Sequence, residues 1–358
     1  MRCFCLILMV FATLVQGAEK HVLQAKYVTD SRLNIWAVAN YDAIYPILSA
    51  MQDLQPNLTI EYQEFSSREL YEAVLSLDGT QEKPDLVMSS AMDLQFKLVN
   101  DGYASPYESD VTIELPDWTK WRNEVFAFTF EPIVMVINRD ILGMNSLPES
   151  REQLLALIRT QSPLVQGKIG VSDIEKVGLG YLTWFHDSQQ SRTYGRLLEA
   201  FGSHHARLYP NSSAMLQALL KGEIFIAYNV LGSYAMEWSS RYPWIDTVMP
   251  TDYTSVVMRT AFVYREAENV DTAHQFLDYL LSDIGQSVMA ESSSLIPISN
   301  TAKGKNSLNV LQRKTHGIFR PIPFGLPLLV QTDQAKRALL LDEWRNAMLE
   351  NKMELISP

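Results

Sequence analysis

Polar residues and glycines recur at four places in this sequence where a strand pattern gives way to a helix pattern. The segments are Asn40-Tyr41-Asp42, Ser89-Ser90-Ala91, residues 178–181 and Tyr228-Asn229. The first N–H groups of a helix lack intrahelical acceptors, and the positive end of the helix dipole lies there, so such places suit an anion. Taken singly, each segment is more often a plain helix cap. Four of them, divided between the two halves of the chain, indicate a ligand-binding cleft.

We predict that these segments, together with one glutamate, supply the ligand-binding residues. The candidates are Asn40, Tyr41, Ser89, Ser90, Ala91, Glu131, Gly180, Tyr181, Tyr228 and Asn229. Within this set, Ser89, Ser90 and the first N–H groups after Ala91 are expected to hold the negative group of the ligand. The remaining turns at Gly180-Tyr181 and Tyr228-Asn229 are expected to form the opposite wall of the cleft.

Signatures of catalysis are largely missing. Neither a GxSxG elbow nor a P-loop nor an HExxH motif occurs, and Thr183 stands where a dinucleotide fingerprint starting at Gly178 needs its third glycine. The pair His204-His205 is more typical of a solvated loop than of a metal site. A glycosidase-like carboxylate pair has no recognisable spacing, because its members meet only in three dimensions. We therefore predict no catalytic or metal-binding residue and no cofactor, with an exported hydrolase that uses a carboxylate pair in the cleft as an alternative.

Three repeats of strand, polar turn and helix fill the first part of the chain. The predicted strands are residues 33–39, 58–65 and 86–88, and residues 66–69, SSRE, form a capping-box match before the second helix. The third helix is expected to end at residues 100–102, NDG, with glycine in its usual C-terminal position. Such repeats build a parallel α/β sheet, which binds ligands at the carboxyl ends of its strands.

Residues 125–140, VFAFTFEPIVMVINRD, begin as an alternating strand and continue as an unbroken apolar one. Pro132 cannot donate to a sheet ladder, so it belongs at a bulge, an edge or a change of sheet. We interpret this stretch as a strand that leaves one lobe and enters another, and residues 254–264 as the return crossing.

The N-terminal residues have the pattern of a signal peptide. Arg2 is followed by an apolar run at residues 3–14 and by small residues at 17 and 18, where cleavage is expected. Both cysteines, Cys3 and Cys5, lie in this segment, so the exported chain would carry no disulfide and no thiolate site. A secreted eukaryotic protein of this length would usually carry disulfides, so we predict a bacterial envelope protein located in the periplasm.

The length of 358 residues suits two lobes, and 47% apolar with 20% charged residues is typical of a folded soluble protein. The net charge is -11 and no basic stripe stands out, so nucleic acid is not an expected partner. We predict a signal peptide at 1–18, a first lobe at 19–130 plus 256–300, and a second lobe at 131–255 plus 301–358 that includes a C-terminal helical tail.

Four stretches resemble the extracellular solute-binding proteins of bacterial ABC importers. They are LNIWAVANYDAIYPIL, PDLVMSSAMDLQFKLVNDGYASPY, FEPIVMVINRD and GEIFIAYNVLGSYA. The most similar branch holds ferric-ion binding proteins and phosphoglycerate- and sugar-phosphate-binding proteins, and SSAMDLQFKLVNDGYA resembles the phosphoglycerate-transport regulatory type. The resemblance implies a type II periplasmic-binding-protein fold of class α/β, in which crossover strands join two lobes and the ligand is enclosed between them.

Ferric-ion binders of this family carry adjacent tyrosines just after the strand that corresponds to residues 224–227. This sequence has Gly232-Ser233 there, with Tyr228 and Tyr234 set apart, whereas a ferric ion needs several anionic oxygen ligands held together. The departure disfavours iron and favours a small polar or anionic organic solute, including a phosphorylated one. The expected function is capture of that solute for an ABC permease of the inner membrane by a monomer without catalytic activity. A periplasmic sensor that reports to a membrane histidine kinase is the alternative that the resemblance leaves open.

Overall fold

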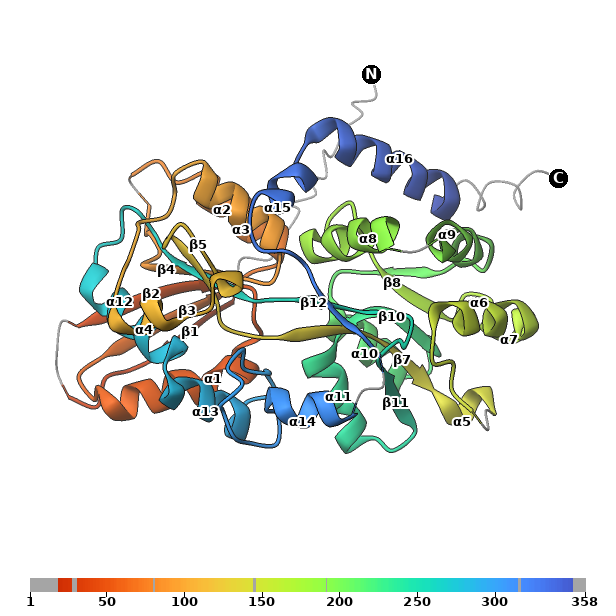
Figure 1. Ribbon diagram of the computed structural model, residues 1–358, viewed down its shortest axis with the longest axis horizontal. Helices are drawn as coiled ribbons and strands as arrows, with labels where there is room; N and C mark the ends of the chain where they lie inside the picture. Colours follow the sequence, from red (N-terminus) through yellow and green to blue (C-terminus); the bar gives the residue numbers. More distant parts are fainter. Residues whose placement is uncertain are drawn as a thin grey trace, which may run out of the picture.

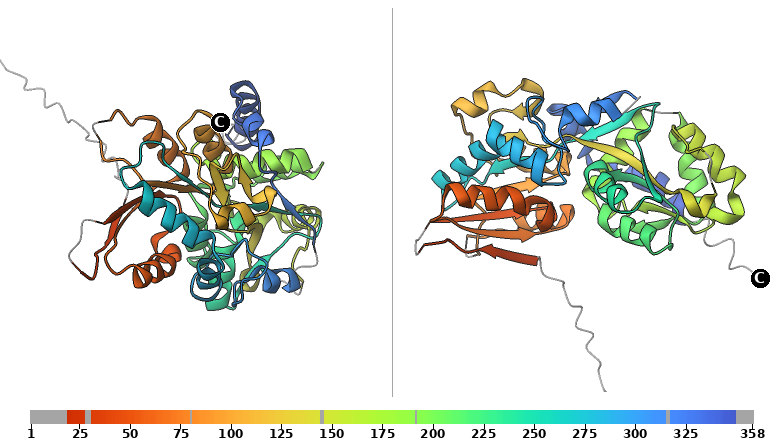
Figure 2. Two further views of the ribbon diagram at one scale, coloured as in Figure 1. Left: turned by 60° about the vertical axis from the view of Figure 1, so that its left-hand side comes forward. Right: turned by 90° about the horizontal axis from the view of Figure 1, so that it is seen from below.

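The computed structural model describes residues 19–27, 31–79, 81–143, 146–190, 192–314 and 317–349. These residues form two α/β lobes that lie side by side, each built on its own sheet (Figure 1; Figure 2). The predicted fold class, with two α/β lobes joined by crossover strands, is confirmed. The signal peptide predicted for residues 1–18 lies outside the described residues. No described helix is both long and apolar enough to span a bilayer.

The first lobe is built on a sheet whose central strands are parallel, as the repeated strand–helix units predict. Along this sheet the order is β1 (Glu19–Leu23), β3 (Thr59–Glu64), β2 (Arg32–Ala37), β4 (Leu86–Ser89), β13 (Thr260–Val263), β6 (Val125–Ala127) and β5 (Lys120–Trp121). Its helices are α1 (Tyr41–Leu54), α2 (Ser67–Leu75), α3 (Met92–Asn100), α4 (Asp110–Glu114), α12 (Val270–Leu281) and α13 (Asp283–Ser292), with a 3-10 turn at Asp117–Thr119. Strand β1 pairs antiparallel with β3 at the sheet edge.

Apolar spacing and caps place the helices that follow the parallel strands. On α1, Ile44 and Leu48 are buried on the face toward the core. The predicted capping box of α2 forms: the Ser66 hydroxyl accepts from the N–H of Glu69, and the Glu69 carboxylate accepts from the N–H of Ser66. Gly102 adopts a φ of +88° just beyond α3, which glycine does without strain. The N-termini of α1, α2 and α3 therefore stand at the carboxyl ends of β2, β3 and β4.

The second lobe is built on a mixed sheet. Its order is β14 (Phe319–Pro321), β12 (Thr254–Val257), β7 (Glu131–Asn138), β10 (Ile226–Leu231), β8 (Ile169–Ser172) and β9 (Arg207–Tyr209), with β11 (Ile245–Val248) also paired to β7. Its helices are α5 (Arg139–Leu142), α6 (Arg151–Thr160), α7 (Ser162–Val165), α8 (Gly178–Gln190), α9 (Thr193–Ser203), α10 (Ser212–Leu220) and α11 (Gly232–Arg241). Strands β10, β8 and β9 are parallel, and their carboxyl ends lead into α11, α8 and α10.

Two extended connections carry the chain between the lobes, as the sequence predicts. Strand β6 continues through residues 128–130 into β7, and β12 continues through Met258 and Arg259 into β13. The connections run antiparallel, with Val256 opposite Pro132. Pro132 lies near the start of β7, before the pairing of β7 with β10 begins, so its missing N–H removes no bond from that pair.

The C-terminal segment packs on both lobes. Helix α14 (Leu308–Lys314) precedes β14, and α15 (Leu326–Gln331) and α16 (Gln334–Leu349) follow it. Helix α15 lies against α3 of the first lobe, and α16 lies against α9 of the second (Figure 1). The Arg337 guanidinium lies 4.2 Å from the ring centroid of Tyr181, and Arg345 pairs with Glu175. The division of the chain that assigns residues 301–358 to the second lobe stays a prediction.

A buried carboxylate lies beneath this tail. Asp93, on α3, is 1% exposed, and its Oδ1 has no hydrogen-bond partner among the described residues. Burial raises the pKa of Asp93 to about 6, against the opposing effects of the Leu94 N–H and of Arg337. Because the folded state holds this proton more tightly than the unfolded chain does, the charged carboxylate destabilises the fold at neutral pH.

Asp93→Asn should therefore stabilise the protein at pH 7 and change it little at pH 4. In the unmodified protein, this carboxyl should lower the free energy of unfolding by up to about 3 kcal/mol as the pH rises from about 4 to about 6. The variant should not show this decrease. Urea unfolding across this pH range measures the effect, with exposed Asp117→Asn as the control. A variant that is less stable than the unmodified protein at pH 7 would contradict the assignment.

Candidate ligand-binding site

A cavity of about 400 Å³ lies between the two lobes. It stands at the carboxyl ends of the parallel strands of both sheets, where α/β sheets bind ligands. From the first lobe it is lined after β2, β3 and β4, and from the second lobe after β8, β9 and β10. The polar residues of the lining are Glu19, Asn40, Glu64, Ser66, Ser67, Glu69, Ser90, Ser172, Asn211, Ser212, Tyr234 and Arg259. We call this space the Arg259 cavity.

Arg259 lines the cavity from the connection between β12 and β13. Its side chain is almost fully buried, and its Nε donates to Glu131 Oε1 at 3.1 Å. Its Nη2 is buried and has no hydrogen-bond partner among the described residues. Burial lowers the pKa of Arg259, while Tyr234 and Glu131 raise it, and the balance raises it above its usual value. Arg259 is therefore a permanent cation that has an unused donor, and it is the only cation among the described residues of the lining.

Asn40 joins the two lobes at the edge of this cavity. Its Nδ2 donates to Glu64 Oε1 at 2.8 Å, and its Oδ1 accepts from Ser213 Oγ of the second lobe at 3.2 Å. Its backbone N–H donates to the Tyr234 hydroxyl at 3.2 Å. Tyr41 donates its N–H to the other oxygen of Glu64, but its ring stacks on the His21 ring, outside the cavity. Desolvation raises the pKa of the half-buried Glu64.

The three residues after β4 have different surroundings. Ser89 Oγ accepts from the N–H of Ala91 at 3.1 Å, so this serine caps its own turn. Ser90 is 1% exposed and lines the cavity, and its hydroxyl has no partner among the described residues. Ala91 is fully buried and packs beneath α8, where a Cβ placed on Gly178 would lie 3.2 Å from the Ala91 Cβ.

The start of α8 contacts the first lobe directly. The N–H of Gly178 donates to Ser67 Oγ at 3.0 Å. Of the two residues predicted to line the cleft here, Gly180 packs on Ser172, and Tyr181 donates its hydroxyl to the Gln331 carbonyl of the tail at 3.1 Å. Neither lines the cavity, whose wall is formed here by Leu179.

Tyr228 and Asn229 belong to a buried network inside the second lobe. The Tyr228 hydroxyl accepts from Arg151 Nε at 2.8 Å and donates to Asp187 Oδ2 at 2.9 Å. Asn229 Nδ2 also donates to Asp187 Oδ2 at 2.9 Å, and Tyr253 donates to Asp187 Oδ1 at 2.7 Å. Asn229 sits at a β-bulge with a φ of +58°. Because neither Tyr228 nor Asn229 lines the Arg259 cavity, the structure separates these two candidates from Asn40 and Ser90.

Several residues of the cavity are not among the candidates from the sequence. Glu64, Ser172 and Tyr234 stand at strand ends or helix starts, like the candidates, but their types and spacing gave no stronger signal than other such residues. Arg259 carried a signal: it is a lone charge inside the apolar stretch TSVVMRTAFVY, and a charge within a buried strand requires a partner. That partner is Glu131, a candidate, which is fully buried against Arg259 and is not itself part of the lining.

Comparison with known proteins relates this geometry to a family. Residues 81–314 match the sequence model of the bacterial extracellular solute-binding proteins. The chain is similar to the substrate-binding protein of an ABC transporter from Agrobacterium tumefaciens, whose structure shows 31% identity, a TM-score of 0.87, and coverage of 92% of this chain and 98% of that one. A search of curated proteins finds no match.

Two more distant structures share the fold. AfuA of Actinobacillus pleuropneumoniae, a periplasmic binding protein solved with fructose-6-phosphate, is 15% identical over 89% of this chain and 99% of that one, with a TM-score of 0.73. Iron-bound HitA of Pseudomonas aeruginosa is 16% identical over 89% of this chain and 100% of that one, with a TM-score of 0.65. At such identities the likeness extends to the fold alone.

Tyr228→Phe should destabilise the protein, because Asp187 and Arg151 would each lose a buried hydrogen bond. We expect the free energy of unfolding to fall by about 1–3 kcal/mol in urea titrations. Tyr45→Phe, which changes a tyrosine that is 46% exposed, is the matched control. If Tyr228→Phe keeps the stability of the unmodified protein, the hydrogen bonds of the Tyr228 hydroxyl do not stabilise the fold, which would contradict this prediction.

Proposed function

This chain belongs to the bacterial extracellular solute-binding proteins, and we propose that it captures a small polar solute with one anionic group in the Arg259 cavity. A protein of this family delivers its solute to the permease of an ABC transporter. We propose the same role here, in the periplasm, after export by the signal peptide expected at residues 1–18.

The observation that carries the proposal is the unused Nη2 of Arg259. A buried guanidinium donor without an acceptor is costly, and an anionic oxygen at the cavity would satisfy it. The hydroxyls of Ser90 and Ser172, which have no partners among the described residues, can donate to the same group.

The carboxylates of the lining limit the charge of the solute. Glu19, Glu64 and Glu69 share the cavity with a single arginine, whose charge is already paired with Glu131. A doubly charged phosphate monoester, which the sequence allows, would bring a second negative charge without a second cation among the described lining residues. We therefore propose a singly charged group, such as a carboxylate, at Arg259, with hydroxyl or amine groups of the solute facing Glu64.

Hydrogen bonds across the cavity indicate how the solute would be enclosed. Ser67 accepts from Gly178 of the second lobe, and Asn40 contacts both Ser213 and Tyr234. These bonds hold the lobes together around the cavity. We therefore propose that the bonds break and the lobes swing apart about the two crossing connections when the solute is released.

The hydrolase alternative is less well supported. The two oxygens of Glu64 accept from Asn40 and Tyr41, and Glu69 accepts from the N–H of its own helix cap. Both carboxylates therefore serve the structure. Glu19 is the one remaining carboxylate among the described residues of the lining, and a single carboxylate does not make an acid and base pair. Signalling to a histidine kinase remains the alternative use of the same binding event, and a kinase gene beside this one in the genome would favour it.

A solute panel tests the proposal. Thermal-shift measurements should compare small carboxylates, sugar phosphates, neutral sugars and amines. We expect stabilisation by carboxylates that carry hydroxyl or amine groups, and weaker effects of sugar phosphates. Stabilisation by neutral sugars or amines alone would contradict an anion at Arg259.

Ser89 and Ser90 form a matched pair for the site itself. Ser90→Ala should weaken binding of a solute identified in the panel by about ten- to a hundredfold, because it removes a hydrogen bond to a charged group. Ser89→Ala should leave the affinity unchanged and lower the free energy of unfolding by about 1 kcal/mol, because it removes the buried hydrogen bond to the N–H of Ala91. Calorimetric titration and melting of both variants measure this, and equal affinities would place the anion away from Ser90.

A further inference from the structure

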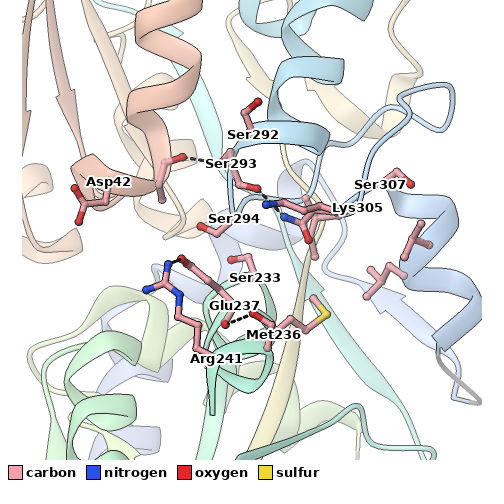
Figure 3. Close-up of a pocket in the computed structure, with 16 residues that line it drawn as sticks. Asp42, Ser233, Met236, Glu237, Arg241, Ser292, Ser293, Ser294, Lys305 and Ser307 are labelled. Atoms are coloured by element: carbon pink, nitrogen blue, oxygen red, sulfur yellow. Dashed lines mark hydrogen bonds and ion pairs between the residues drawn. The ribbon is translucent and has the colours of Figure 1, made fainter. Parts of the chain in front are cut away.

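A second cavity between the lobes has a volume of about 580 Å³ (Figure 3). Asn40 and Tyr234 line the Arg259 cavity, whereas their near neighbours Ala43 and Ser233 line this one. From the first lobe it is bounded by the start of α1 and by the segments that follow α13, and from the second lobe by α11. We call it the Lys305 cavity.

Two buried hydroxyl groups at this cavity have no hydrogen-bond partner in the part of the chain that the structure describes. Ser233 is 1% exposed, and its Oγ makes no hydrogen bond among the described residues. The same holds for the buried Oγ of Ser294, which comes from the other lobe. Buried hydroxyls are almost always hydrogen-bonded, so two unpaired ones at one cavity indicate a polar occupant.

Helix α11 adds donors on the side of Ser233. Its ten residues begin at Gly232, and the residue before it, Leu231, provides no side-chain cap. The N–H groups of the first turn therefore keep their donor capacity, and the positive end of the helix dipole lies beside the Ser233 hydroxyl.

The described residues of the lining include two acids and two bases, and one of the bases, Lys305, has no close partner among them. Arg241 is paired with Glu237 on the same helix, so their charges cancel. Lys305 lines the cavity without an ion pair or hydrogen bond among the described residues. Figure 3 shows Ser233, Ser294 and Lys305 around the same space, with Asp42 at its far rim.

We propose that the Lys305 cavity binds a small oxyanion, such as inorganic phosphate or sulfate, held by Lys305, Ser294 and Ser233. The anion would join Ser294 of the first lobe to Ser233 of the second lobe. Lys305 would hold it from the first-lobe side, because the N–H of the next residue, Asn306, donates to the Ala290 carbonyl of α13 at 3.0 Å. Helix α11 also carries Tyr234 to the Arg259 cavity, so an anion bound at its start favours one arrangement of the lobes over others. By linkage, it would then change the affinity of the Arg259 cavity for its solute. This coupling rests on the proposed function, whereas binding of the oxyanion does not.

Calorimetric titration of the exported protein with inorganic phosphate, and separately with sulfate, tests the site. We expect millimolar or tighter binding that weakens by about tenfold or more in Lys305→Gln and in Ser233→Ala. Lys303→Gln is the matched control, because Lys303 is an exposed lysine, as Lys305 is, but does not line the cavity. Ser90→Ala should bind both anions as the unmodified protein does.

Each other result overturns the proposal. Absence of binding by the unmodified protein, or equal binding by Lys305→Gln and Lys303→Gln, would leave the cavity without its ligand. Weaker binding in Ser90→Ala with normal binding in Lys305→Gln would place the anion in the Arg259 cavity. That outcome would support anion binding in the Arg259 cavity and would contradict oxyanion binding in the Lys305 cavity, so the experiment distinguishes the two proposals.

Discussion

The arrangement of the lobes depends on the buried ion pair between Arg259 and Glu131. Arg259 belongs to one crossing connection and Glu131 to the other, so their 3.1 Å bond ties the two connections together where the chain changes lobe. The Arg259 N–H also donates to Thr129 Oγ1 at 2.9 Å, which adds a backbone link at the same level. Removing one partner of such a pair strands a charge in the interior, at a cost of about 3–5 kcal/mol. The pair is thus a structural constraint that uses the Nε of Arg259 and leaves its Nη2 without an acceptor among the described residues.

Two helices of the second lobe begin at glycines that lie in close contact with neighbouring segments: α11 at Gly232 and α8 at Gly178. A Cβ on Gly232 would lie 2.8 Å from the carbonyl oxygen of Pro132, so only glycine lets α11 begin against the crossing strand. A Cβ on Gly178 would lie 2.7 Å from Leu94 Cδ1, so the Leu94 side chain would have to move if another residue stood where α8 meets α3. Both helix starts therefore reach the interlobe region, where they place Tyr234 and Ser233 on one side and Leu179 on the other. The same glycines explain why donors from both lobes converge on the two cavities.

The sequence predicts the fold well where its signals are local. The alternation of Phe126, Phe128 and Phe130 before Pro132 locates the crossing, and the SSRE pattern locates a capping box that forms. Strand β1 escapes prediction because its EKHVL sequence is a polar edge without an apolar run. Helix α15 is not predicted, because its first two residues, Leu326 and Pro327, end the proline-rich stretch PIPFGLP, a composition typical of a linker.

The site is less predictable, because its members meet only in the folded chain. Strand ends and helix starts lead to Asn40 and Ser90, which line the Arg259 cavity. They lead equally to Tyr228, whose partners Arg151 and Asp187 are 77 and 41 positions away in the sequence. No local pattern separates a hydroxyl that faces a cavity from one that faces such a network.

Binding of an anionic solute at Arg259 is tested most directly by a crystal structure of the exported protein with the solute that it carries from its native periplasm. We expect solute density in the Arg259 cavity, with an anionic oxygen within hydrogen-bonding distance of Arg259 Nη2. A solute bound elsewhere, or one that turns a positive group toward Arg259, would contradict it.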